Sequence, residues 1–151
     1  MAVIRPFKAL RPTKEKSQLV ASVPYDVVNR EEAKQFAEGN PLSYLHITRS
    51  EIDLPEVKDV YSKEVYLKAK ENLNQIIEQA PLNVDEKSHL YLYRLIMDGR
   101  SQTGICATFS VDDYDNDVIL KHEKTRKVKE DDRTNHIITT EAQTGVVFLT
   151  Y

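Results

Sequence analysis

The sequence predicts an α+β fold in which a mixed or largely antiparallel sheet packs against one long amphipathic helix. Apolar residues recur at helical spacing over roughly residues 57–80. Two runs rich in β-forming residues, 90–97 and 103–111, flank the pair Asp98-Gly99, which favours a tight hairpin turn. Strands and helices do not alternate strictly, which argues against a parallel βαβ sheet.

Composition is typical of a folded globular domain. The chain has 151 residues, of which 40% are hydrophobic and 30% charged. Its formal net charge of -3 argues against a protein that coats nucleic acid. The one cysteine, Cys106, lies in an apolar run, and we interpret it as a core residue. Because no disulfide can form within the chain and no apolar run approaches membrane-spanning length, we expect a cytoplasmic protein without a membrane contact.

The N-terminal third of the sequence predicts only short elements. Residues 20–23 are a candidate strand, followed by a loop of defined conformation at 24–28. Asn29 predicts a helix N-cap with Glu32 as its capping-box partner, and Gly39 predicts the end of that helix.

Residues 42–48 alternate between apolar and polar, which predicts a further strand. We interpret His46, on its polar side, as a surface or hydrogen-bonded histidine rather than a ligand. Pro55 suits the first turn of the long helix, and Pro81 ends it.

The acidic run at 112–117 is interpreted as a solvated turn, because it lacks the glycine and terminal glutamate of a calcium loop. Residues 118–120 predict a short strand. The last residues, 146–151, predict another strand with nothing after it. We therefore interpret residues 1–151 as a single N-terminal domain or a fragment of a longer protein, whose missing C-terminal part would be its partner.

The most charged segment runs from Lys121 to His136. If this segment is a helix, the spacing of its five basic residues places them all on one face: His122, Arg126, Lys129, Arg133 and His136. A helix normally buries an apolar stripe, and this segment has little to bury, so we expect its cationic face to meet an anion. The alternative is a solvated helix whose cations pair with its own acidic residues.

A phosphate site suits this segment better than a metal site. His122 and His136 would lie about 21 Å apart along a helix, which is too far to share one ion, so no metal site is predicted. Glu123 lies near the expected helix start, where it could act as a base. The groups suited to phosphate oxygens are three cations and a hydroxyl: Arg126, Lys129, Arg133 and Thr125.

Five motifs occur together, in order, over nearly the whole chain. They are Arg5-Pro6-Phe7; Pro24-Tyr25-Asp26-Val27; Asn40-Pro41-Leu42-Ser43 with His46-Ile47-Thr48-Arg49; His122-Glu123-Lys124-Thr125 with Lys129, Asp132 and Arg133; and Ala142-Gln143-Thr144-Gly145. Their combination resembles the bacterial and archaeal domain-of-unknown-function family 1015.

The resemblance implies a longer protein, because family members carry a later Asp-Gly-His-His-Arg-Tyr motif that is not found here. That motif is similar to one in the ParB/sulfiredoxin-like superfamily, whose members bind nucleotides and include free-serine kinases. Family genes often lie beside those of serine biosynthesis. The resemblance therefore implies ParB/sulfiredoxin-like elements and a serine-related role. The site residues that it implies are His122, Glu123, Thr125, Lys129 and Arg133, with Tyr25 and Asp26 in second rank.

Two functions are expected from these observations. The first is a nucleotide-dependent phosphotransferase, a kinase of a small polar metabolite such as serine. Its cations would hold the phosphates, Mg²⁺ would bridge them, and Glu123 or Asp26 would deprotonate the acceptor hydroxyl. The second is a non-catalytic sensor domain that binds a phosphorylated metabolite or nucleotide with the same residues. The ligand expected in both is a small-molecule anion or nucleotide, and the structural alternative is an ion-paired helix.

Overall fold

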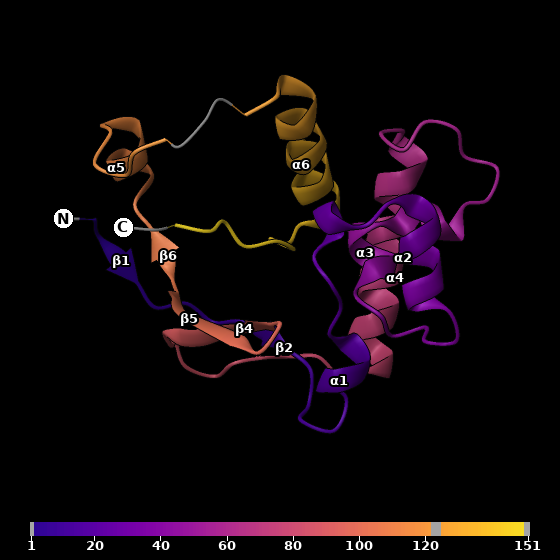
Figure 1. The fold of residues 1–151 in the computed structure, drawn as a ribbon, viewed down its shortest axis with the longest axis horizontal. Helices are drawn as coiled ribbons and strands as arrows, with labels where there is room; N and C mark the ends of the chain where they lie inside the picture. Colours follow the sequence, from indigo (N-terminus) through magenta and orange to yellow (C-terminus); the bar gives the residue numbers. More distant parts are fainter. Residues whose placement is uncertain (1, 122–124, 150–151) are drawn as a thin grey trace. The chain divides into compact units, whose positions relative to one another are not determined.

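The computed structural model describes residues 2–121 and 125–149, which belong to two compact units (Figure 1). The smaller unit lies within Met1–Arg11 and Val84–Lys124, and the larger within Pro12–Asn83 and Thr125–Tyr151. Helices, small antiparallel sheets and one long helix confirm the predicted α+β class. None of the helices in the described ranges is both long and apolar enough to cross a membrane.

The smaller unit contains a β-hairpin. Its strands are β4 (Tyr91–Met97) and β5 (Arg100–Cys106), which pair antiparallel. The two residues between them, Asp98 and Gly99, have φ angles of 49° and 77°. Positive φ at both positions is what a type I′ turn requires, so the predicted hairpin is confirmed.

Two-residue strands accompany the hairpin. β1 (Ile4–Arg5) pairs antiparallel with β6 (Thr108–Phe109), and β2 (Leu10–Arg11) pairs with β3 (Asn83–Val84). The strand predicted over residues 103–111 is therefore divided between β5 and β6, because the chain changes its pairing partner after β5.

Residues predicted to form an acidic turn at 112–117 instead begin within a short helix, α5 (Val111–Asp115). The Ser110 side chain caps this helix by accepting from the Asp113 N–H at 3.2 Å. The strand predicted over residues 118–120 is wrong. The N–H groups of the first two of these residues both donate to the Asp113 carbonyl, at 2.8 and 2.9 Å, so they close the end of α5 instead of pairing with a strand.

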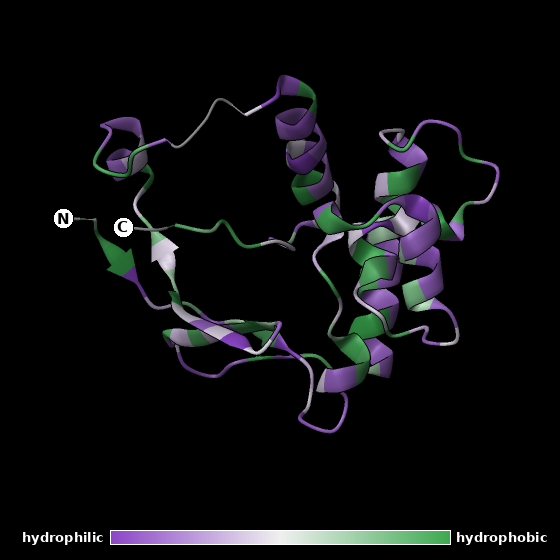
Figure 2. Ribbon diagram, in the orientation of Figure 1, coloured by the Kyte–Doolittle hydropathy of each residue, from purple (hydrophilic) through white to green (hydrophobic). Residues whose placement is uncertain are grey.

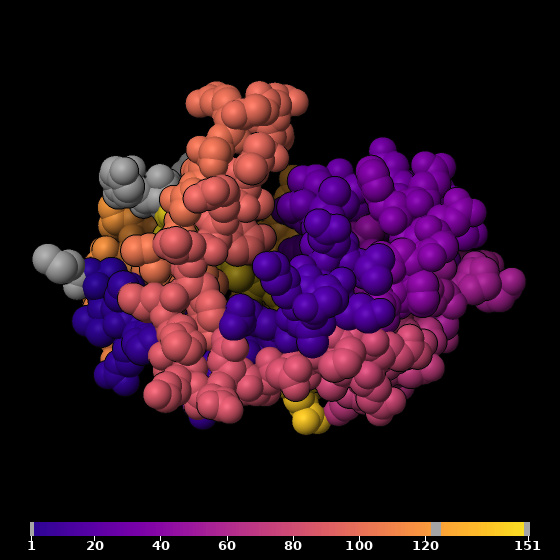
Figure 3. All heavy atoms as spheres, turned by 90° about the horizontal axis from the view of Figure 1, so that it is seen from below, coloured from indigo at the N-terminus to yellow at the C-terminus, as the bar shows by residue number. Residues whose placement is uncertain are grey.

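The larger unit is mainly helical. Its elements are α1 (Ser17–Val20), the 3-10 helix η1 (Tyr25–Val27), α2 (Arg30–Ala37), α3 (Leu45–Thr48), the 3-10 helix η2 (Ser50–Asp53), α4 (Lys63–Gln79) and α6 (Lys127–Thr140). In the space-filling view, the purple atoms of the α2–α3 region form a continuous surface (Figure 3).

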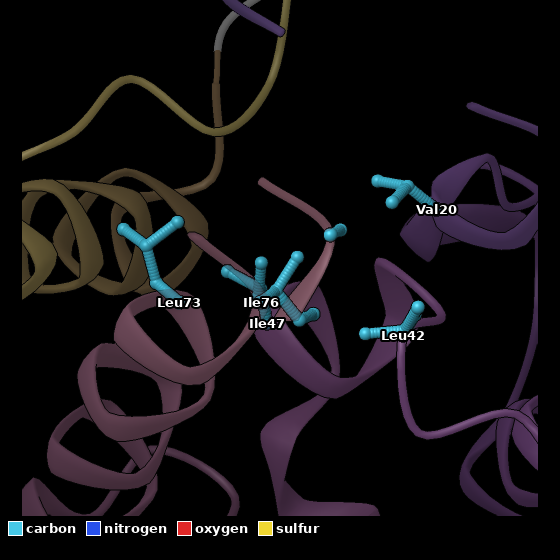
Figure 4. Close-up of a cluster of buried hydrophobic side chains, with 6 residues drawn as sticks. Val20, Leu42, Ile47, Leu73 and Ile76 are labelled. Carbon is cyan, nitrogen blue, oxygen red and sulfur yellow. The ribbon is translucent and has the colours of Figure 1, made fainter. Parts of the chain in front are cut away.

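Two clusters of buried side chains hold these helices together. In one cluster, Ile47 of α3 meets Leu73 and Ile76 of α4, and Val20 and Leu42 lie beside them (Figure 4). The second cluster joins α2, α3 and η2 through Ala33, Ala37, Leu45 and Ile52. The short helix α3 therefore contributes to both clusters.

The long helix α4 carries the predicted apolar stripe, and Val65, Ala69, Leu73 and Ile76 are all buried. Its predicted start near residue 57 is wrong, because the helix begins at Lys63. The Asp59 side chain accepts from the Tyr61 N–H at 2.9 Å, and the Asp59 carbonyl accepts from Ser62 at 3.1 Å. These local hydrogen bonds form a turn that competes with the helix.

The predicted ends of α2 are confirmed. The Asn29 side chain accepts from the Glu32 N–H at 3.0 Å, and the Glu32 carboxylate accepts from the Asn29 N–H at 2.8 Å. These two bonds form a capping box. After the helix, Gly39 has a φ of 72°, which suits a residue without a Cβ.

Two further strands predicted from short apolar or alternating runs are wrong. Val20 ends α1, so residues 20–23 are not a strand, and residues 42–48 include α3. Alternation over only a few residues also fits one helical turn whose opposite sides are both buried, as happens in α3. Residues 146–149 pair with no strand in the described part of the chain, and Thr150 and Tyr151 lie outside it.

His46 is hydrogen-bonded, as the sequence predicts. Its Nδ1 lies 2.9 Å from Asp53 Oδ2, and its Nε2 lies 3.2 Å from the Asn40 carbonyl oxygen. Asn72 donates to the same Asp53 oxygen at 2.7 Å. Because both ring nitrogens face acceptors, the imidazolium form fits best, and the hydrogen bond to Asp53 raises the pKa of His46.

This raised pKa predicts a pH-dependent contribution to stability. The folded protein binds the His46 proton more tightly than the unfolded chain, so the stabilisation is complete below a pH of about 6.5 and disappears as pH rises through the folded pKa. We expect the difference in free energy of unfolding between wild type and His46→Gln to be largest below about pH 6.5 and to shrink as pH rises above that value. Urea denaturation at several pH values measures it. Asp53→Asn should show the same trend, and a pH-independent difference would contradict the prediction.

Candidate anion-binding site

The charged segment forms α6, but the helix starts later than predicted. Arg126 is its N-cap residue, with extended backbone angles of φ -69° and ψ 127°. Thr125 and Arg126 therefore precede the helix, and both are exposed. His122 and Glu123 lie outside the described residues. Of the five basic residues predicted to share one helical face, Lys129, Arg133 and the buried His136 lie within α6. As expected, α6 is mostly hydrophilic (Figure 2).

Lys129 and Lys127 have different surroundings. Lys127 lies 2.8 Å from Asp131 and is neutralised on the helix surface, as the solvated-helix alternative predicts. Lys129 instead donates to the Tyr61 hydroxyl at 3.1 Å, with its Nζ 5.5 Å from the centroid of that ring. Among the residues that the structure describes, no carboxylate lies within ion-pair distance of Lys129. Its charge is therefore available to an external anion.

Arg133, one helical turn further on, lies over a second tyrosine ring. Its Cζ is 4.4 Å from the centroid of Tyr25 in η1, which is a cation–π distance. Its Nε and Nη2 donate to Asp132 Oδ2 at 3.1 and 2.9 Å. Within the described ranges its Nη1 donates to no protein group, and the side chain keeps 30% of its exposure. Solvent or a ligand can thus reach part of the guanidinium.

Asp132 and Tyr66 form a buried pair behind Arg133. The Asp132 side chain is only 8% exposed, and its Oδ1 accepts from the Tyr66 hydroxyl of α4 at 3.1 Å. Burial, together with the neighbouring Asp132 carboxylate, raises the pKa of Tyr66 to about 12. The phenol therefore stays protonated and remains a donor at neutral pH. The sequence assigns Tyr66 no role, and it offers Asp132 as part of a family motif and as one of the acidic residues that pair with the cations of a solvated helix.

His136 lies on the same helix face, but the prediction that it adds positive charge to this face is wrong. It is 3% exposed, and its Nε2 lies 3.0 Å from the carbonyl oxygen of Ile47 in α3. Its Nδ1 lies 3.3 Å from the Thr144 hydroxyl. Burial lowers its pKa, so the neutral ring with a proton on Nε2 fits both contacts. His136 therefore connects α6 to α3 instead of extending the cationic face.

The other predicted residues lie around this face. Tyr25 is half-buried against Arg133, and the adjacent Asp26 is exposed. In the described part of the chain, Asp26 forms no ion pair. No group of three or more His, Cys, Asp or Glu residues in that part is placed to hold a metal ion. The structure thus joins Tyr25, Lys129 and Arg133 into one candidate site and adds Tyr61 to it.

Two of the motifs that are distant in sequence meet at this site, the one containing Tyr25 and the one containing Arg133. The family model described as "Protein of unknown function (DUF1015)" matches residues 4–151. The chain belongs to this DUF1015 family. Comparison with curated proteins and with solved structures gives no significant match. The ParB/sulfiredoxin-like similarity of DUF1015 therefore stays a prediction.

Proposed function

We propose that the protein binds the phosphate groups of a nucleotide at the N-terminal half of α6 and transfers one of them to a small polar metabolite such as serine. One observation carries the proposal. Lys129 and Arg133 lie one turn apart on the same helix face, and each contacts a tyrosine from another segment. Cations held in this way, with free donors, suit a ligand with several anionic oxygens.

Three physical features favour phosphate as this ligand. Arg133 offers a planar donor group, and Lys129 offers a compact charge that can adjust to a second oxygen. The rings of Tyr25 and Tyr61 lie against Arg133 and Lys129, respectively, at cation–π distances, and help to hold the two cations in place. The first turn of α6 lacks a side-chain cap, so its N–H groups and the positive end of the helix dipole add further attraction.

Asp26 is the residue that we assign as the base. Its carboxylate is exposed and directly follows Tyr25, whose ring contacts Arg133, which supports this assignment. Asp26 would take the proton of the acceptor hydroxyl while that oxygen bonds to the terminal phosphorus, and the bond from that phosphorus to the leaving nucleotide breaks. Mg²⁺ would arrive with the nucleotide and supply charge neutralisation of its phosphates. Glu123 is the other predicted base, and Thr125 and Arg126 would add donors near the start of α6.

The proposal predicts that Lys129→Ala and Arg133→Ala each weaken nucleotide binding by about tenfold, because charge-assisted hydrogen bonds are lost. Calorimetry with ATP, ADP and CTP in the presence of Mg²⁺ measures the affinity. Mass spectrometry of phosphoserine after incubation with serine measures turnover, which Asp26→Asn should reduce. Lys127→Ala is the matched control, since it removes an equal charge that Asp131 already neutralises.

The outcomes separate the candidate functions. Binding without turnover would support the sensor alternative instead of the phosphotransferase. Equal losses in Lys127→Ala and Lys129→Ala would indicate general charge attraction and not a site. If the wild-type protein bound none of the three nucleotides, the proposal would be refuted.

A further inference from the structure

A negative charge lies directly behind the proposed phosphate site. Asp132 contacts Arg133 at 2.9 Å, and its side chain is 8% exposed, so water screens it poorly. By simple electrostatics this carboxylate should repel a phosphate that approaches Arg133. Attraction of the phosphate therefore cannot explain why a buried carboxylate lies beside Arg133, and another physical role must be found for it.

The hydrogen bonds around Asp132 indicate that role. Its two oxygens have separate partners, with Oδ1 accepting from Tyr66 and Oδ2 accepting from both Nε and Nη2 of Arg133. Tyr66 belongs to the rigid helix α4, so its hydroxyl fixes the direction of the carboxylate. Two bonds to one oxygen then fix the plane of the guanidinium.

Tyr25 completes this restraint. Its ring lies against the guanidinium, with Cζ 4.4 Å from the ring centroid. A guanidinium held at one edge by Asp132 and on one face by Tyr25 has little freedom to rotate. Its Nη1, which has no protein partner in the described ranges, is then directed away from Asp132. A donor that is already oriented binds an anion without the entropy loss of ordering a long side chain.

We infer that Asp132 and Tyr66 are positioning residues, which orient Arg133 to receive a phosphate oxygen on Nη1. The inference rests on the proposed function. It adds two residues that contact no ligand themselves and act only through Arg133. It also makes a prediction opposite in sign to the electrostatic one, since removing the Asp132 charge should weaken phosphate binding.

The test compares neighbouring carboxylates on α6. We expect Asp132→Ala to weaken the binding of ATP with Mg²⁺ by about tenfold. Asp131→Ala is the matched control, because it removes an equal charge from an exposed position whose ion-pair partner is Lys127 and not Arg133. It should leave affinity unchanged or strengthen it slightly. Tyr66→Phe removes one hydroxyl and should weaken binding about threefold. Thermal unfolding establishes that each variant is folded, and Tyr66→Phe keeps the test valid if Asp132→Ala unfolds.

A double-mutant cycle separates positioning from a general structural effect. If Asp132 acts through Arg133, then adding Asp132→Ala to Arg133→Ala should cause no further loss of affinity. In the protein without ligand, the Nε–H signal of Arg133 in an NMR spectrum should be protected from exchange in wild type and lose this protection in Asp132→Ala.

Each other outcome has a distinct meaning. Tighter ATP binding by Asp132→Ala, or losses that multiply in the double variant, would overturn the positioning role and leave the phosphate site intact. A wild-type protein that binds no ATP would instead refute the proposed function, and the inference with it.

Discussion

Replacing Ile76 by alanine is expected to destabilise the larger unit by about 3–4 kcal/mol, the usual cost of a cavity in a close-packed core. Ile76 is 1% exposed and packs against Ile47 and Leu73, where α4 meets α3 (Figure 4). Its neighbours belong to helices held by several other contacts, so the structure has little freedom to close the cavity. Urea denaturation followed by circular dichroism measures the change.

Leu67→Ala is the control for this prediction. Leu67 lies on the same helix but is 50% exposed, and alanine has at least the helix propensity of leucine. We expect a change of less than about 1 kcal/mol. If the two variants were equally unstable, the assignment of Ile76 to the core would be wrong, because helix formation alone would then explain the loss.

The elements that could be predicted from the sequence are those with a strong local signal. α4 repeats its apolar residues over several turns, and the Asp98-Gly99 turn needs two positive φ angles that few other residue pairs adopt. The capping box of α2 likewise depends on residues three positions apart. In these elements the local chemistry and the tertiary structure favour the same conformation.

The short elements could not be predicted, because their conformation depends on distant partners. Residues 42–48 have a strand-like pattern, but the Tyr44 N–H donates to the Val20 carbonyl, and α3 then packs between two clusters. Residues 118–120 have a β-rich composition, yet the Asp113 carbonyl accepts two of their N–H groups. β propensity describes how a side chain fits a sheet and does not by itself supply the partner strand.

The candidate site shows the same division. Lys129, Arg133 and Tyr25 could be selected from residue chemistry and from the family resemblance. The contacts of Tyr61 and Tyr66 with α6 join residues 68 and 66 positions apart. Tyr66 lies in α4 and Tyr61 in the turn before it, so both contacts depend on how α6 lies against this part of the chain. The sequence pattern of neither segment reveals that arrangement. One signal was present, since Tyr66 falls beside Val65 on the buried side of α4.

His136→Leu is expected to destabilise the larger unit by about 2 kcal/mol, even though leucine is apolar and similar in size. The substitution leaves the buried carbonyl of Ile47 without the Nε2 donor that now lies 3.0 Å away, and it removes the contact to Thr144. His136→Gln should lose less stability, because its amide can still donate to the same carbonyl. Equal losses in the two variants would show that shape, and not the hydrogen bond, decides the stability.

The pH dependence of this variant gives a second and independent test. Burial lowers the pKa of His136 in the folded protein, and nearby Arg133 acts in the same direction, while Asp132 opposes it. The unfolded chain therefore takes up the proton first, and the wild type loses stability as pH falls below about 6.5 toward the folded pKa. The difference between wild type and His136→Leu should shrink in acid. The corresponding difference for His46→Gln should shrink in alkali, because the pKa of His46 is raised. Opposite slopes in the two series would distinguish a histidine buried as a neutral donor from one held as a cation, and parallel slopes would contradict the assignment of these two states.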